Sequence, residues 1–193
     1  MKRMNPDRRN LLAGACAFAG TAALGHSSAV LAQAPLVSAS PSPAAMEAKA
    51  LPLPAPGTLI KLPDVPLFDG TVFRPAQAEG QVLVIYWWAS DCPFCALQSP
   101  EMQKLWQSQR TKGQQGLQML TLSIDRKRED ALAYLKKNGY TFPAGFVTPD
   151  IQRVLPKPRG LPITLVRGRD GKLLQAEKGQ LFPEDVELLA QWL

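Results

Sequence analysis

An unbroken apolar stretch that leads into a pair of cysteines is the feature that most constrains how this chain can fold. Residues 82–88 carry only aliphatic and aromatic side chains, several of them β-branched, which is typical of a strand buried on both faces of a sheet. Cys92 and Cys95 follow shortly afterwards, and a helical pattern begins at Pro93. The chain therefore places two cysteines where a buried strand ends and a helix begins.

This position favours thiol chemistry. The N-terminus of a helix presents unpaired backbone N–H groups and a partial positive charge, which stabilise a thiolate relative to a thiol. We expect Cys92 to be exposed at the helix tip and Cys95 to lie a turn inside, shielded from solvent. Cys92 can then attack a disulfide of another protein, and Cys95 can resolve the mixed disulfide.

Two structural uses of the cysteine pair fit the sequence less well. A structural zinc site needs four ligands, whereas beyond residue 34 the chain holds only these two cysteines and no histidine, since its single histidine is His26. A structural disulfide that closes so short a loop adds little stability. The ligand count leads us to expect no metal site, and we also expect no cofactor and no tightly bound small molecule.

The segments around the cysteines alternate between strand and helix patterns. This order predicts an α/β domain with a mixed central sheet flanked by helices. The expected helices cover residues 93–112, 128–138 and 183–193, with a helical turn at 150–155, and the further strands cover residues 116–124, 145–147, 163–167 and 172–175. The helical residues expected to face the core are Leu97, Met102, Leu105, Trp106, Gln109, Leu132, Leu135, Val186, Leu189, Ala190 and Trp192.

The first 34 residues are predicted to be an export signal. A basic start that includes Arg8 and Arg9 precedes a soft apolar run over residues 11–24, and small residues follow it. The paired arginines indicate the twin-arginine route, with the general secretory route as the alternative. We expect cleavage after Ala32 and a periplasmic mature protein. Residues 35–58, rich in Pro, Ala and Ser, are predicted to be a linker, which leaves residues 59–193 as the domain.

The charge of the chain argues against a nucleic-acid partner. The formal net charge is +6, and residues 1–34 account for +3 of it through their four basic residues and Asp7. The excess left on the rest of the chain is too small to indicate phosphate binding.

Several short segments in order resemble the thioredoxin family. Residues 86–95, Tyr-Trp-Trp-Ala-Ser-Asp-Cys-Pro-Phe-Cys, are similar to the active-site segment F-W-A-x-W-C-x-x-C. Pro100 matches the proline that kinks the active-site helix, Pro162 matches the family's cis-proline, and Gly179 matches the glycine near the end of the last strand. Residues 67–70 resemble an L-x-D-x-x-G element, and with the spacing they indicate the TlpA/ResA-like branch of exported thioredoxins, within the redoxin/AhpC-TSA-like group.

The resemblance implies a thioredoxin-like fold with an N-terminal β extension and a thiol–disulfide oxidoreductase, with Cys92 as nucleophile and Cys95 as resolving cysteine. It implies protein thiols and disulfides of the periplasm as partners, a membrane electron donor, the reductase direction and a monomer. The residues that this interpretation assigns to substrate binding are Leu161, Pro162, Trp88 and Phe94.

Three positions depart from the family pattern. Tyr86 stands where cytoplasmic thioredoxins have a buried aspartate, and Gln98 stands where cytochrome-maturation members have a glutamate. Asp91 replaces the tryptophan before the first cysteine, and its charge is expected to oppose thiolate formation at Cys92.

Two other functions remain as alternatives. A thiol peroxidase of the peroxiredoxin kind would need a threonine three residues before the reactive cysteine, where this chain has Ala89. A copper chaperone of the Sco type would need a C-x-x-x-C motif and a histidine, which the predicted domain lacks.

Overall fold

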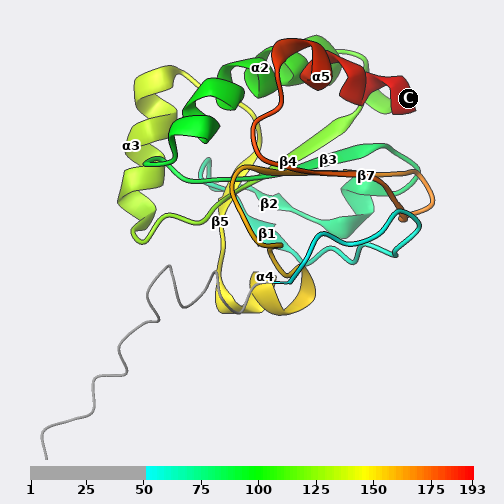
Figure 1. The fold of residues 1–193 in the computed structure, drawn as a ribbon, viewed down its shortest axis with the longest axis horizontal. Helices are drawn as coiled ribbons and strands as arrows, with labels where there is room; N and C mark the ends of the chain where they lie inside the picture. The colour runs from blue at the N-terminus through cyan, green and yellow to red at the C-terminus, as the bar shows by residue number, and fades with distance from the viewer. Residues whose placement is uncertain (1–50) are drawn as a thin grey trace, which may run out of the picture. The chain divides into compact units, whose positions relative to one another are not determined.

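The computed structural model describes residues 51–193, and the predicted export signal with its cleavage site and most of the predicted linker lie outside these residues. Figure 1 shows the arrangement of the elements. The strands are β1 (Val65–Pro66), β2 (Val72–Phe73), β3 (Leu83–Trp88), β4 (Gln118–Ser123), β5 (Ala144–Phe146), β6 (Ile163–Arg167) and β7 (Leu173–Lys178). The α-helices are α2 (Pro93–Arg110), α3 (Arg128–Asn138), α4 (Pro149–Val154) and α5 (Pro183–Leu188), and short 3₁₀ segments cover Pro75–Ala78, Gly113–Gln115 and Leu189–Trp192.

The central sheet is mixed, with the strand order β5-β4-β3-β6-β7. Strand β3 lies in its middle, parallel to β4 and antiparallel to β6, and all six of its residues are buried. The carboxyl ends of β3 and β4 therefore meet the start of β6 at one edge of the sheet. In this register Trp88 pairs with Ser123 and Trp87 pairs with Ile163. The loops that follow β3 and β4 and the loop that precedes β6 thus share this edge.

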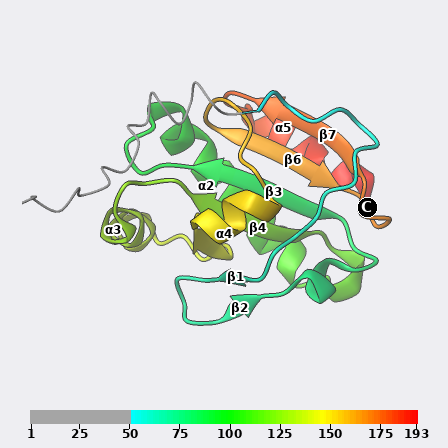
Figure 2. The ribbon, with the colours of Figure 1, turned by 90° about the horizontal axis from the view of Figure 1, so that it is seen from below.

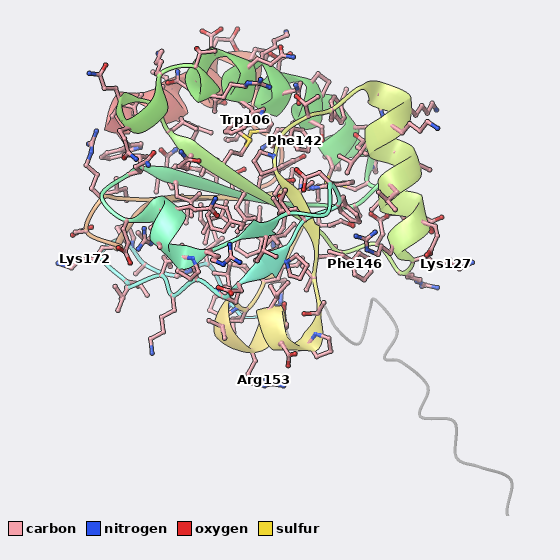
Figure 3. The ribbon with its side chains drawn as sticks, turned by 180° about the vertical axis from the view of Figure 1, so that it is seen from behind. Trp106, Lys127, Phe142, Phe146, Arg153 and Lys172 are labelled. Atoms are coloured by element: carbon pink, nitrogen blue, oxygen red, sulfur yellow. A yellow bond between two sulfur atoms is a disulfide. The ribbon has the colours of Figure 1, made fainter. Side chains whose placement is uncertain are left out.

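Successive residues of β3 point into two hydrophobic clusters on opposite faces of the sheet. Tyr86 and Trp88 belong to the cluster formed with α2, α3 and α5, whereas Trp87 belongs to the cluster formed with α4, β1 and β2. Figure 2 shows α4 and the β1–β2 hairpin on the face of the sheet that carries the Trp87 cluster. In Figure 3, Trp106 lies between α2 and the sheet, and Arg153 lies on the opposite side of the sheet. These layers are those of a thioredoxin-like fold, and the separate β1–β2 sheet is the expected N-terminal β extension.

The predicted helices form, but two of their leucines do not face the core. Leu97 is 60% exposed and Leu132 is 37% exposed, so both inward placements are wrong. In α2 the buried face runs through Cys95, Gln98 and Ser99, one position away from Leu97. The spacing of apolar residues predicted the wrong face for the start of α2, because two of the residues buried there, Gln98 and Ser99, are polar.

The last predicted helix also differs in form. It is α-helical only to Leu188 and continues as a 3₁₀ segment, within which Trp192 is half-buried and donates a hydrogen bond from its indole Nε1 to Gln175 at 2.9 Å.

Backbone pairing begins before Leu59, the predicted start of the domain. The N–H of Gly57 donates to the oxygen of Leu173 at 2.8 Å, and the N–H of Leu173 donates to the oxygen of Thr58 at 2.8 Å. These bonds occupy backbone groups at the start of β7, which is the edge strand of the sheet.

None of the helices in residues 51–193 combines the length and the apolar character that a membrane-spanning segment needs.

Candidate active site

Cys92 and Cys95 form a disulfide at the N-terminus of α2, with their Cα atoms 5.2 Å apart. Cys92 is the N-cap residue with an extended backbone, and Pro93 occupies the first helical position, which its fixed φ favours. Cys92 is half-buried, whereas Cys95 has no exposed surface. Cys92 is thus the more exposed residue of the pair and Cys95 the shielded one, as the sequence predicts.

The start of α2 directs its N–H groups at Cys92. The backbone N–H of Cys95 donates to the sulfur of Cys92 at 3.2 Å, and the N–H of Ala96 donates to the backbone oxygen of Cys92 at 3.0 Å. Both the hydrogen bond to sulfur and the positive end of this 18-residue helix favour a thiolate at Cys92 once the disulfide is reduced.

The loop between β3 and Cys92 is held from the neighbouring strand. The N–H of Cys92 donates to the oxygen of Ala89 at 3.2 Å, which closes a turn. The carboxylate of Asp125, just after β4, accepts from the N–H of Ser90 at 2.9 Å and from its hydroxyl at 2.5 Å. Sequence reasoning missed Asp125 and Ser90. The parallel alignment of the two strand ends is the signal that could have found them.

A neutral hydroxyl pair lies behind Cys95. The hydroxyl of buried Tyr86 donates to the backbone oxygen of Cys95 at 3.3 Å and shares a hydrogen bond with the hydroxyl of Ser99 at 3.1 Å. Burial raises the pKa of Tyr86 well above its ordinary value. Tyr86 therefore stays protonated from neutral pH into the alkaline range and brings no charge to the buried cysteine.

Gln98 joins the active-site helix to two other parts of the domain. Its side chain is fully buried, donates from Nε2 to the hydroxyl of Thr164 at 2.9 Å, and accepts at Oε1 from the N–H of Leu181 at 2.8 Å. Both ends of the amide are thus satisfied, which is what a buried polar group requires.

The loop before β6 has the expected form. The peptide bond between Leu161 and Pro162 is cis, which confirms that prediction. Pro162 is buried and accepts at its oxygen from the N–H of Gly179 at 2.9 Å, so two positions of the thioredoxin resemblance lie together. Leu161 is half-buried at the same edge of the sheet as Cys92.

The remaining candidates differ in their exposure. Phe94, between the cysteines, is 56% exposed, and Asp91 is also exposed. Trp88 is fully buried, with its indole Nε1 donating to Thr121 at 3.2 Å and its ring 5.2 Å from that of Tyr134. The placement of Trp88 on the substrate-binding surface is therefore wrong, because the strand directs this side chain beneath the helices.

No group of three or more His, Cys, Asp and Glu side chains that could hold a metal ion occurs among the described residues. The chemistry available at this edge of the sheet is that of the two sulfurs, one of them reachable from solvent.

Comparisons with known proteins agree with this site. The model of the AhpC/TSA family matches residues 56–147. No curated protein matches the chain. A structure from Chlorobium tepidum, assigned as the thiol:disulfide interchange protein DsbE, has a TM-score of 0.61 and 25% identity, covering 72% of this chain and 94% of that one.

Two further structures show the same fold. A thioredoxin family protein from Chlorobium tepidum TLS has a TM-score of 0.63 and 19% identity, covering 72% of this chain and 97% of that one. A protein from Bacteroides thetaiotaomicron, assigned as a protein disulfide isomerase, has a TM-score of 0.64 and 22% identity, covering 74% of this chain and 91% of that one. Residues 56–147, which hold the cysteine pair at the start of α2, thus match the AhpC/TSA family, and the domain has the thioredoxin-like fold.

Proposed function

We propose that this thioredoxin-like oxidoreductase exchanges disulfides with protein substrates in the periplasm, acting as a reductase through Cys92 and Cys95. The observation that carries the proposal is the geometry of the pair. The half-buried sulfur of Cys92 accepts a helix N–H, and the sulfur of Cys95 lies bonded to it but shielded from solvent.

The reaction begins from the reduced pair. The Cys92 thiolate attacks one sulfur of a substrate disulfide, so that the substrate S–S bond breaks and its second sulfur leaves as a thiolate that takes up a proton. The sulfur of Cys95 then attacks the sulfur of Cys92, and the proton of the Cys95 thiol passes to the substrate thiolate that leaves. The mixed disulfide breaks and releases the first substrate sulfur as a thiolate. Two electrons have passed to the substrate, and the chain holds the Cys92–Cys95 disulfide seen in the structure.

The charge next to Cys92 supports the reductase direction. In thioredoxin-like proteins a stabilised reduced form makes the pair oxidising, and a less stabilised one makes it reducing. Asp91 is exposed beside Cys92, and its carboxylate opposes the thiolate that the helix N-terminus favours. A membrane electron donor would then return the disulfide to the dithiol after each cycle.

The periplasmic location rests on residues 1–34, whose basic start, apolar run and small residues are those of an export signal. An oxidising compartment is also where a disulfide-exchange protein meets its substrates.

A purified-protein assay tests the function. The reduced chain should reduce the disulfides of insulin, with one disulfide broken per Cys92–Cys95 pair oxidised, and Cys92→Ala should abolish the reaction. The family match makes thiol peroxidase activity the second candidate, although Ala89 stands where that chemistry needs a threonine. Hydrogen peroxide consumption at a rate above that of insulin reduction would overturn the proposal in favour of a peroxidase.

A further inference from the structure

Asp125 joins the loop before the nucleophile to the neighbouring strand. Its Oδ1 accepts from both the backbone N–H and the hydroxyl of Ser90, at 2.9 and 2.5 Å. Its Oδ2 accepts from the hydroxyl of Ser123, the last residue of β4, at 2.6 Å. The N–H of Asp125 donates back to the same Ser123 hydroxyl at 3.2 Å. The carboxylate of Asp125 is half-buried, and its contacts with Ser123 at the end of β4 fix its position while it accepts both hydrogen bonds from Ser90.

The held loop is short and leads directly to Cys92. Ser90 lies two residues before Cys92, and Ala89 accepts the hydrogen bond from the Cys92 N–H. Asp91, which lies between Ser90 and Cys92, is exposed to solvent. The position of the N-cap residue relative to the rest of α2, and with it the 3.2 Å hydrogen bond from the Cys95 N–H to the Cys92 sulfur, depends on how this loop is held.

We propose that Asp125 is a positioning residue that holds the Ser90 loop so that the Cys92 sulfur stays on the N–H groups at the start of α2. The inference rests on the proposed function, because it assigns to Asp125 the task of keeping the nucleophile of that reaction in place. Neither the resemblance to thioredoxins nor the cysteine motif assigned it.

The positioning role and the charge of Asp125 act in opposite directions on Cys92. The hydrogen bonds to Ser90 favour the thiolate by keeping the sulfur at the helix N-terminus. The negative charge disfavours a second negative charge nearby, as does that of Asp91. Two substitutions separate these effects. Asp125→Asn removes the charge and keeps an oxygen that accepts from Ser90, whereas Asp125→Ala removes both.

The test measures the rate of iodoacetamide alkylation of Cys92 against pH in the reduced full chain. Fragmentation of the alkylated peptide assigns the modified sulfur to Cys92, which separates it from Cys95 and from Cys16 of the predicted export signal. In Asp125→Ala we expect alkylation at pH 7 to slow by about three- to tenfold and its midpoint to move to higher pH. In Asp125→Asn we expect a rate equal to or above that of the unsubstituted chain. Rescue by asparagine is a result that a charge effect does not give.

Control variants complete the design. Asp170→Ala removes a carboxylate that accepts from the Lys172 N–H at 3.0 Å in the turn between β6 and β7, at the opposite edge of the sheet, and should leave Cys92 unchanged. Ser90→Ala removes only the hydroxyl bond and should slow alkylation less than Asp125→Ala does. It carries the test if Asp125→Ala does not fold.

Two results would overturn the positioning role. Faster alkylation of Cys92 in both Asp125 variants would show that Asp125 acts on Cys92 through its negative charge and not by positioning the loop. A rate in Asp125→Ala, or in Ser90→Ala where that variant carries the test, equal to that of the unsubstituted chain would remove the link between this carboxylate and Cys92. Insulin reduction by the unsubstituted chain tests the proposed function separately, so its failure is distinguishable from the failure of this inference.

Discussion

The backbone N–H of Cys95 points at the sulfur of Cys92 from 3.2 Å, although the side chains of the two residues differ sharply in their access to solvent. In the proposed reaction, Cys95 thus contributes both the resolving sulfur and a hydrogen bond to the attacking sulfur. The bond exists because Cys92 caps α2 and Cys95 is the third residue of the helix. Spacing of three between the cysteines is what allows both.

Removing the charge of Asp91 should change the reactivity of Cys92. In Asp91→Asn the Cys92 thiolate no longer faces an adjacent carboxylate, so its alkylation at pH 7 should become roughly twofold faster and the reduction potential of the pair should rise. The effect is small because Asp91 is exposed and screened by solvent. Equilibration with glutathione measures the potential. A lower potential in Asp91→Asn would show that this charge does not favour the reductase direction.

The Tyr86 hydroxyl should contribute to stability in a pH-dependent way. Burial raises its pKa above the ordinary value of 10.0, so above about pH 10 the unfolded chain loses this proton while the folded chain keeps it. The free energy of unfolding should therefore fall with rising pH, by up to about 1.4 kcal/mol per pH unit from this group. In Tyr86→Phe the fall should be shallower. Urea unfolding from pH 8 to 11 measures the free energy of unfolding at each pH. An equal fall with pH in the unsubstituted chain and in Tyr86→Phe would contradict the raised pKa of Tyr86.

Tyr86→Phe should also lower stability at pH 7. The change removes a hydroxyl that bonds to Ser99 and to the backbone oxygen of Cys95, with little change in shape. We expect a loss of about 1 kcal/mol from these buried hydrogen bonds.

The buried side-chain amide of Gln98 should contribute more to the free energy of unfolding than an exposed glutamine on the same helix. Gln98→Ala leaves the N–H of Leu181 and the hydroxyl of Thr164 without their partner inside the domain, and we expect a loss of about 2–4 kcal/mol in the free energy of unfolding. Gln107→Ala, at an exposed position of α2, is the matched control and should change it by less than about 0.5 kcal/mol. Equal effects of the two substitutions would rule out the bridging role.

Much of the fold is predictable from the sequence because its local signals are strong. The apolar run of residues 82–88 does become the buried central strand β3, and α3 ends at Gly139, whose φ of 66° is the left-handed conformation that favours glycine. The placement of both cysteines at the start of α2 follows from the same local patterns.

Besides the two misplaced leucines, what the sequence does not predict comes from contacts between distant parts of the chain. Asp125 reaches Ser90 only because β3 and β4 pair in parallel, and Gln98 is buried because Thr164 and Leu181 supply partners for its amide. Trp88, expected at the substrate surface, is covered by an aromatic contact with Tyr134 of α3. These pairings follow from how strands and helices lie next to one another, and the residues adjacent to each partner in the sequence do not indicate them.

The exposed ring between the cysteines should matter for protein substrates only. Phe94→Ser should leave stability within about 0.5 kcal/mol of the original, because the ring is 56% exposed. It should raise KM for insulin while leaving the reaction with oxidised glutathione within about twofold, since a small disulfide does not need the apolar contact. Leu188→Ser, at an equally exposed position of α5, is the control and should change neither. A matching loss with glutathione would show that Phe94 acts on the sulfurs rather than on the substrate.

The division of labour between the two cysteines is the central claim, and trapping of the mixed disulfide tests it most directly. When the reduced single-cysteine variants meet a disulfide-bonded protein, Cys95→Ala should accumulate a covalent adduct through Cys92, because no second thiol remains to release it. Cys92→Ala should form none, since the sulfur of Cys95 is buried. Non-reducing electrophoresis with mass spectrometry of the linked peptides identifies the sulfur involved. An adduct that forms through Cys95 and not through Cys92 would contradict the account.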